Sequence, residues 1–152
     1  FLYMYHADTS QKYQTDFSFL TDDLYTDLPI NCEHKLIFSK KTEYGGTEDF
    51  RFRVNFNGKS FDDFRETLST KEVKEFDKLF HASGHKIGGY AYFTQGDPRE
   101  DEPERKDDIL LLQIDTDKEI MFGDAGIANI FINVDDLKKK RFDKAYFNWD
   151  CA

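Results

Sequence analysis

The feature that most constrains the fold is a continuous apolar run, ILLLQI, at residues 109–114. A short apolar run without alternation is typical of a strand with both faces covered, so we expect an interior strand of a sheet. KEIMFGD at 118–124 and IANIFIN at 127–133 follow around a GDAG turn, and each predicts a strand. VDDLKKKR at 134–141 has the acidic start and basic end of a short helix. KAYFNWDCA at 144–152 predicts a last strand or an extended tail.

The preceding half of the chain also contains two strand-like segments. CEHKLIFSK at 32–40 is rich in apolar and aromatic residues and predicts a strand near a sheet edge. FRFRVNF at 50–56 alternates strictly between apolar and polar residues and predicts a half-buried strand.

Between these segments and the apolar run, the pattern becomes helical. SFDDFRETL from Ser60 predicts a short helix, and Ser69 with Glu72 three residues later forms a capping-box pattern. We expect this second helix to reach Ser83 and to end at Gly84. The order of strands, helices and strands predicts a single α+β domain over residues 1–152, with an antiparallel-rich sheet and two or three helices.

Composition excludes several classes of protein. The 152 residues carry a formal net charge of −9 with an isoelectric point near 4.9, which argues against a nucleic-acid-binding surface. No apolar run approaches the roughly 20 residues that span a bilayer, so we expect no membrane partner. The distant cysteines Cys32 and Cys151 fit two reduced thiols and a cytoplasmic location. The segment 96–108 is acidic and contains two prolines, which predicts a flexible, solvated loop.

The segment HKIGGYAYFTQGDPRE at 85–100 raises the question of a phosphate-binding loop. Such a loop needs Lys and Ser or Thr directly after its last glycine, whereas Tyr90 and Ala91 follow Gly89 here. Gly88 and Gly89 therefore predict a structural turn, and no cofactor is expected.

Four residues offer the donor atoms of a zinc site. His81 and His85 lie four apart, and Cys32 and His34 would share one face of a strand. Nothing in the sequence brings the two pairs together, so ordinary surface histidines are favoured and no metal is predicted. Cys32 with His34 also suggests a thiolate and its base, but no orienting third group is readable.

The densest run of carboxylates is IDTDKEIMFGD at 114–124. It fails the EF-hand pattern, which requires Gly at position 120 and Glu at position 126. A carboxylate pair for acid–base catalysis remains an alternative to the favoured role of Asp side chains in turns.

If the chain has a site, we expect it where the Gly-Gly turn, the end of the apolar run and the GDAG turn converge. Polar residues lie in otherwise apolar segments there, and they bond either to one another or to a ligand. The candidate binding residues are His85, Gln95, Gln113, Asp115, Asp124 and Asn129, and the turn glycines are Gly88, Gly89, Gly123 and Gly126.

Four blocks resemble the YwqG-like family of bacterial proteins of unknown function, in the order of that family: HKIGGYAYFTQGDPR, LLLQIDTD, IMFGDAGIANIFI and DLKKKRFDKAYFNWDC. The resemblance is strong over residues 85–151. It implies the C-terminal half of a duplicated α+β architecture, with FLYMYH at 1–6 as the closing strand of an upstream half. Ala91, where the family often has Pro, and Phe122, where it often has Trp, depart from the pattern.

The resemblance implies no reaction, cofactor or catalytic residue. Genes of this type occur near toxin and immunity clusters, so it favours a protein-binding module, immunity-like in character. The alternative is an enzyme or small-ligand-binding domain that uses carboxylates near the GDAG turn. An exposed edge at residues 1–6 would also allow homodimerisation.

Overall fold

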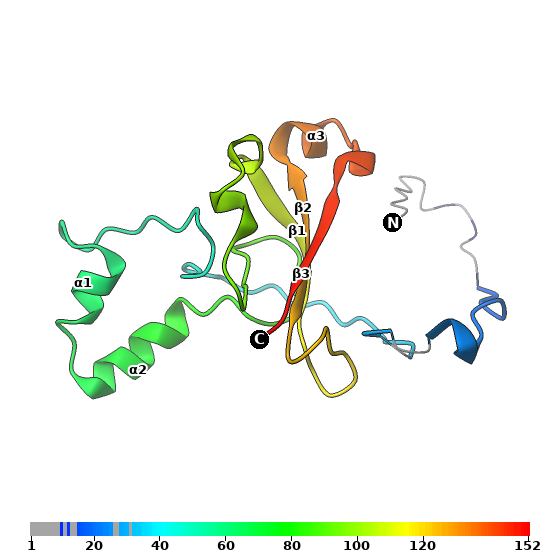
Figure 1. Cartoon of the computed structure of the whole chain (residues 1–152), viewed down its shortest axis with the longest axis horizontal. Coiled ribbons are helices and arrows are strands. Elements are labelled where there is room, and N and C mark those ends of the chain that lie inside the picture. Colours follow the sequence, from blue (N-terminus) through cyan, green and yellow to red (C-terminus); the bar gives the residue numbers. More distant parts are fainter. Residues whose placement is uncertain (1–9, 11, 13–14, 26–27, 31) are drawn as a thin grey trace.

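A computed structural model of the chain describes all residues except 1–9, 11, 13–14, 26–27 and 31. The described part contains three α-helices and a three-stranded antiparallel sheet, which confirms the α+β class (Figure 1). The predicted closing strand at 1–6 lies outside the described residues. Within the described part, no helix has both the length and the apolar character needed to cross a membrane.

The sheet has the order β1-β2-β3, with β1 at Asp108–Ile114, β2 at Ile127–Asn133 and β3 at Tyr146–Asp150. These strands confirm three of the predicted segments. The prediction that 109–114 is an interior strand was wrong, because β2 is central and β1 lies at an edge in the described part. A continuous apolar run reports that both faces of a strand are covered, and it says nothing about neighbours in the hydrogen-bonding direction.

The two faces of the sheet bury separate apolar clusters. One contains Ala91, Phe93, Leu110 and Phe131, and the other contains Ile120, Phe122 and Ala128. Successive residues of a strand point to opposite faces, so β2 supplies Phe131 to one cluster and Ala128 to the other. A bulge between Leu110 and Leu112 of β1 shifts the register and places Gln113 on the same face as Leu110.

A helical lobe stands beside the sheet (Figure 1). It contains α1 at Phe61–Arg65 and α2 at Thr70–Leu79. Ser60 and Ser69 cap these helices, and Ser69 forms the predicted capping box with Glu72. Six aromatic rings pack together within the lobe: Phe52, Phe56, Phe61, Phe64, Phe76 and Phe80.

Helix α2 ends at Leu79, earlier than the predicted Ser83. Phe80 leaves the helical conformation, with φ of −113°, and its buried ring packs against Phe52 at 5.5 Å and Phe61 at 5.3 Å. Helix α3 at Val134–Lys138 confirms the third predicted helix, with Asn133 as its N-cap. Short 3-10 turns are η1 at Asp22–Tyr25, η2 at Pro98–Glu100, η3 at Pro103–Arg105 and η4 at Phe142–Lys144.

Three predicted strands are absent from the described structure. Residues 50–56 begin in a turn and continue as irregular chain. Phe52 and Phe56 pack on the helical lobe, and Phe50 packs against the Arg99 guanidinium, instead of on a sheet. Residues 118–124 make isolated bridges at Ile120 and Phe122, because a tight turn follows at once. Residues 32–40 are extended but pair with no strand in the described part of the chain.

Candidate functional site

A set of side-chain oxygens holds the extended segment 90–95 across one face of the sheet. Backbone N–H groups of this segment donate to side chains that come from two strands, β1 and β3, and two loops. The bonds are Tyr90 to Glu43 (3.0 Å), Ala91 to Asp49 (2.8 Å), Tyr92 to Gln113 (2.9 Å), and Thr94 and Gln95 to Asp150 (2.7 Å each). These backbone N–H groups are therefore hydrogen-bonded although the segment is not a strand of the sheet.

Gln113 is fully buried at the centre of this set. Its Nε2 donates to the carbonyls of Ala82 at 3.0 Å and Gly84 at 2.8 Å, and its Oε1 accepts from Tyr92 N. Its backbone pairs with Lys86 at 2.8 and 3.1 Å. The side-chain amide of Gln113 therefore links β1 to the chain after α2 and to Tyr92. The backbone of Gln113 links β1 to Lys86, just before the Gly-Gly turn.

Asn129 lies opposite Gln113 on β2 and is also fully buried. Its Nδ2 donates to the Tyr92 carbonyl at 2.9 Å. Its Oδ1 and the Oδ1 of Asp150 are buried without a hydrogen-bond partner in the described structure. Gln113 therefore accepts from the backbone N–H of Tyr92, and Asn129 donates to the backbone carbonyl of the same residue.

His85 and Asp115 form a second small group beside the framework. His85 Nδ1 accepts from Asp115 N at 3.1 Å, so Nε2 carries the proton and donates to Asp117 Oδ2 at 3.1 Å. The Asp115 carboxylate accepts from Gly84 N at 2.6 Å and Thr116 N at 2.7 Å.

Asp117 is held in the same manner. The N–H groups of Glu119 and Ile120, and then His85, lower the pKa of the Asp117 carboxyl. The carboxylate oxygens of Asp115 and Asp117 therefore accept mainly from backbone N–H groups, and His85 is a further donor to Asp117.

The two remaining candidates lie at the C-terminal end of the chain. Gln95 Nε2 donates to the Cys151 carbonyl. The Asp124 carbonyl accepts from Ala152 N at 3.1 Å, and the Asp124 side chain is exposed. The structure brings together His85 with Asp115 and Gln113 with Asn129, whereas Gln95 and Asp124 are separate from both pairs.

The predicted turn glycines occupy special positions. Gly88, Gly89 and Gly123 have positive φ angles of 72°, 84° and 58°. A Cβ at Gly89 would collide with the Glu43 carboxylate, which binds Lys86 Nζ at 2.6 Å and accepts from Tyr90 N. A Cβ at Gly126 would collide with two backbone carbonyl oxygens. Gly89 and Gly126 therefore leave no room for a side chain, whereas a Cβ at Gly88 would meet open space.

A buried ion cluster around Arg99 was not predicted from the sequence. The guanidinium is fully buried and binds both oxygens of Asp97 at 2.9 and 2.6 Å, Asp49 at 3.1 Å and the Asp108 carbonyl at 2.9 Å. It also stacks over the Phe131 ring at 4.3 Å from the centroid. The segment 96–108 is thus not solvated throughout, because the side chains of Asp97 and Arg99 are buried. The sequence signal for this cluster is the acidic residue Asp97, two positions before Arg99.

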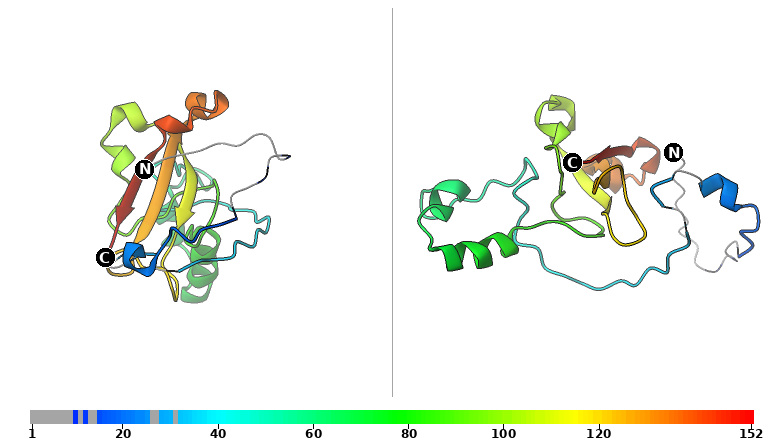
Figure 2. Two further views of the ribbon diagram at one scale, coloured as in Figure 1. Left: turned by 90° about the vertical axis from the view of Figure 1, so that its right-hand side faces the viewer. Right: turned by 60° about the horizontal axis from the view of Figure 1, so that its bottom comes forward.

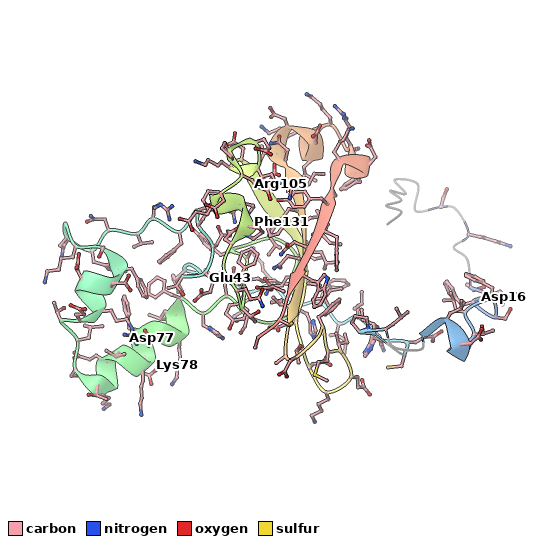
Figure 3. The ribbon with its side chains drawn as sticks, in the orientation of Figure 1. Asp16, Glu43, Asp77, Lys78, Arg105 and Phe131 are labelled. Carbon is pink, nitrogen blue, oxygen red and sulfur yellow. The ribbon has the colours of Figure 1, made fainter. Side chains whose placement is uncertain are left out.

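Phe131 and Glu43 lie in the central part of the molecule (Figure 3). Asp77 and Lys78 lie instead on the helical lobe (Figure 3). A shallow hollow of about 570 Å³ lies between α1 and α2, lined in part by Phe64, Leu68 and Leu79. None of the predicted site residues lines it.

An exposed apolar strip, which we define as residues 35–41, is the most unusual surface of the described chain. Its sequence is KLIFSKK, and Leu36, Ile37 and Phe38 are 72%, 85% and 73% exposed. Residues 33–44 make no backbone hydrogen bond to other described residues. The right-hand view of Figure 2 shows this cyan segment running apart from the sheet.

The four residues weighed for a zinc site do not meet. His85 binds Asp117, and the His81 ring packs on Tyr92 at 5.1 Å. Cys32 and His34 lie instead beside Glu119, a residue that the sequence did not single out for this role.

Comparison with known proteins gives a family and no activity. A search of curated proteins finds no match to this chain. The family model described as a domain of unknown function, DUF1963, matches residues 1–151. The chain therefore belongs to the DUF1963 family.

Proposed function

We propose that this domain is a protein-binding module, and that the exposed apolar strip pairs with an extended, acidic segment of a partner protein. The observation that carries the proposal is the exposure of three consecutive apolar side chains on an extended backbone. Contiguous exposed apolar surface of this kind marks interaction sites. Backbone groups with no partner among the described residues suit the addition of a strand from another protein.

Charge favours an acidic partner. The strip carries Lys35, Lys40 and Lys41 and no acidic residue, and all three lysines are exposed. The chain as a whole has a net charge of −9, so the strip is a local reversal of its charge. Carboxylates beside the apolar contacts of the partner would complement it.

The two ends of the strip are anchored, which lowers the entropic cost of binding. Before it, Ile30 bridges Ile120, and the Pro29 carbonyl accepts from Met121 N at 3.0 Å. After it, Glu43 binds Lys86 and Tyr90. The segment between these anchors is held extended before a partner arrives.

The experiment is photo-crosslinking from position 37 of the full chain, produced in its native host. We expect one stoichiometric protein to be captured through an acidic, extended segment, and Phe38→Glu to abolish capture. Phe17→Ser, which changes another exposed apolar residue, should retain it.

A synthetic peptide of the captured segment then tests the mode of binding. It should bind more weakly in high salt and to a Lys40→Glu/Lys41→Glu variant. Crosslinks confined to a second copy of this chain, or capture that Phe38→Glu leaves unchanged, would overturn the proposal.

A further inference from the structure

Three side chains with different donor atoms meet immediately before the exposed apolar strip. Cys32 Sγ lies 3.4 Å from His34 Nε2, and His34 Nδ1 lies 3.7 Å from Glu119 Oε2. One ligand atom of each residue lies within 4.8 Å of those of the other two. A thiol, an imidazole and a carboxylate are the three side-chain types that bind zinc.

The backbone explains why these residues meet although they lie far apart in the sequence. The bridge between Ile30 and Ile120 aligns the two segments that carry them. Asp117 Oδ1 accepts from Glu119 N at 2.8 Å and Ile120 N at 2.9 Å, which fixes the turn that presents Glu119. Cys32 and His34 are two residues apart in one segment, and their side chains are in contact.

We infer that Cys32, His34 and Glu119 form a binding site for a divalent zinc ion. Zinc bonds of about 2.0–2.3 Å in a tetrahedral arrangement place neighbouring ligand atoms roughly 3.3–3.6 Å apart. The separation between Cys32 Sγ and His34 Nε2, 3.4 Å, lies within this range. Glu119 Oε2 contacts the other ring nitrogen of His34, Nδ1, at 3.7 Å, so it lies beside the site without occupying a ligand position. His34 would bind through Nε2 beside the Cys32 thiolate, and the exposed Glu119 side chain is free to rotate into the third position.

The position of the site suggests what the ion does. Cys32 and Glu119 are exposed, so the fourth position faces water or a partner. The ion would tie the start of the exposed apolar strip to the loop at 117–120. Zinc binding requires the thiolate, so it releases a proton and weakens as pH falls.

The test is zinc titration of the full, metal-free chain in a non-chelating reductant, by competition with a chromophoric chelator. We expect one zinc ion per chain. Cys32→Ser and His34→Ala should abolish binding, and Glu119→Gln should weaken it about 10–100-fold. The matched controls are Cys151→Ser, which changes the other cysteine, and His81→Ala, and both should bind as the wild type does.

Cobalt substitution supplies a second readout that requires no partner protein. A thiolate-to-cobalt charge-transfer band should appear in the wild type and in Cys151→Ser, and vanish in Cys32→Ser. Zinc should also raise the melting temperature of the wild type and leave that of Cys32→Ser unchanged. Zinc that binds Cys32→Ser as tightly as the wild type, or no saturable one-to-one binding, would overturn the site. Crosslinking in the presence of a chelator keeps failure of this site distinct from failure of the proposed function.

Discussion

At the scale of single residues, the buried amide of Gln113 links three segments that share no regular secondary structure. It binds two carbonyls, of Ala82 and Gly84, and one backbone N–H, of Tyr92. Leucine has a similar volume but no polar atoms, so it would leave these three groups buried and unpaired.

We therefore predict that Gln113→Leu lowers the free energy of unfolding by about 3 kcal/mol, since each buried unsatisfied group costs about 1–3 kcal/mol. Asp124→Asn, at an exposed turn position, should change it by less than about 0.5 kcal/mol. Urea denaturation measures both. A Gln113→Leu variant as stable as the wild type would mean that water satisfies these groups equally well.

Asp49 makes stability depend on pH. Burial raises the pKa of its carboxyl, but hydrogen bonds from Arg51, the charge of Arg99 and the Ala91 N–H outweigh burial, so the pKa lies below its ordinary value of 3.8. A carboxyl group with a depressed folded-state pKa contributes stability above its unfolded pKa of about 3.9. That contribution is lost as pH falls through the folded-state value.

We predict that Asp49→Asn is less stable than the wild type at neutral pH, and that it loses less stability between about pH 6 and pH 3. The urea midpoint across this range measures the difference. Asp124→Asn serves as the control and should keep the wild-type pH dependence. An equal acid-induced loss in Asp49→Asn and the wild type would contradict this assignment.

At the scale of elements, the central strand is β2, and β1 is an edge strand whose free side is partly covered by a bridge between Lys86 and Gln113. Strand β2 is bonded on both sides, and its residues Phe131 and Ile132 are fully buried. Opening β2 therefore requires the loss of both ladders.

Native-state hydrogen exchange should show the slowest exchange at amides 128–132 of β2. The amides of β1 that face its free edge should exchange faster, with Gln113 N as an exception because it donates to the Lys86 carbonyl at 2.8 Å. Slower exchange throughout β1 than in β2 would indicate that another strand covers the edge of β1.

At the scale of the whole molecule, the exposed apolar strip contributes little to the stability of the described fold. Its side chains contact water, whereas the Phe131 ring fills the core next to Arg99. A substitution in the strip should therefore separate partner binding from folding.

Ile37→Lys should change the free energy of unfolding by less than about 0.5 kcal/mol, as surface substitutions usually do. Phe131→Ala, the matched core control, should cost about 3–5 kcal/mol. Calorimetric melting compares the two variants. A large loss of stability in Ile37→Lys would show that the strip packs against part of the protein in solution.

Local patterns in the sequence were sufficient for the features that depend on neighbouring residues. Ser69 and Glu72 predicted the capping box, IANIFIN predicted a strand, and KAYFNWDCA predicted a last strand or an extended tail. The α+β class followed from the order of strands and helices. These features are readable because helix caps and strand faces are decided within a few residues.

Only the tertiary structure decided which residues meet. The clusters of Arg99 with Asp49, of Gln113 with Tyr92, and of Cys32 with Glu119 join positions far apart in the chain. Strand order was likewise decided only by the tertiary structure, and the predicted interior position of 109–114 was wrong because an apolar run reports burial and not pairing. The predicted strand at 32–40 remained unpaired, because a strand requires a partner for its backbone groups and the described chain supplies none there. The sequence by itself determined the strand propensity of residues 32–40. The tertiary structure determined their exposure, because it places no described strand beside them.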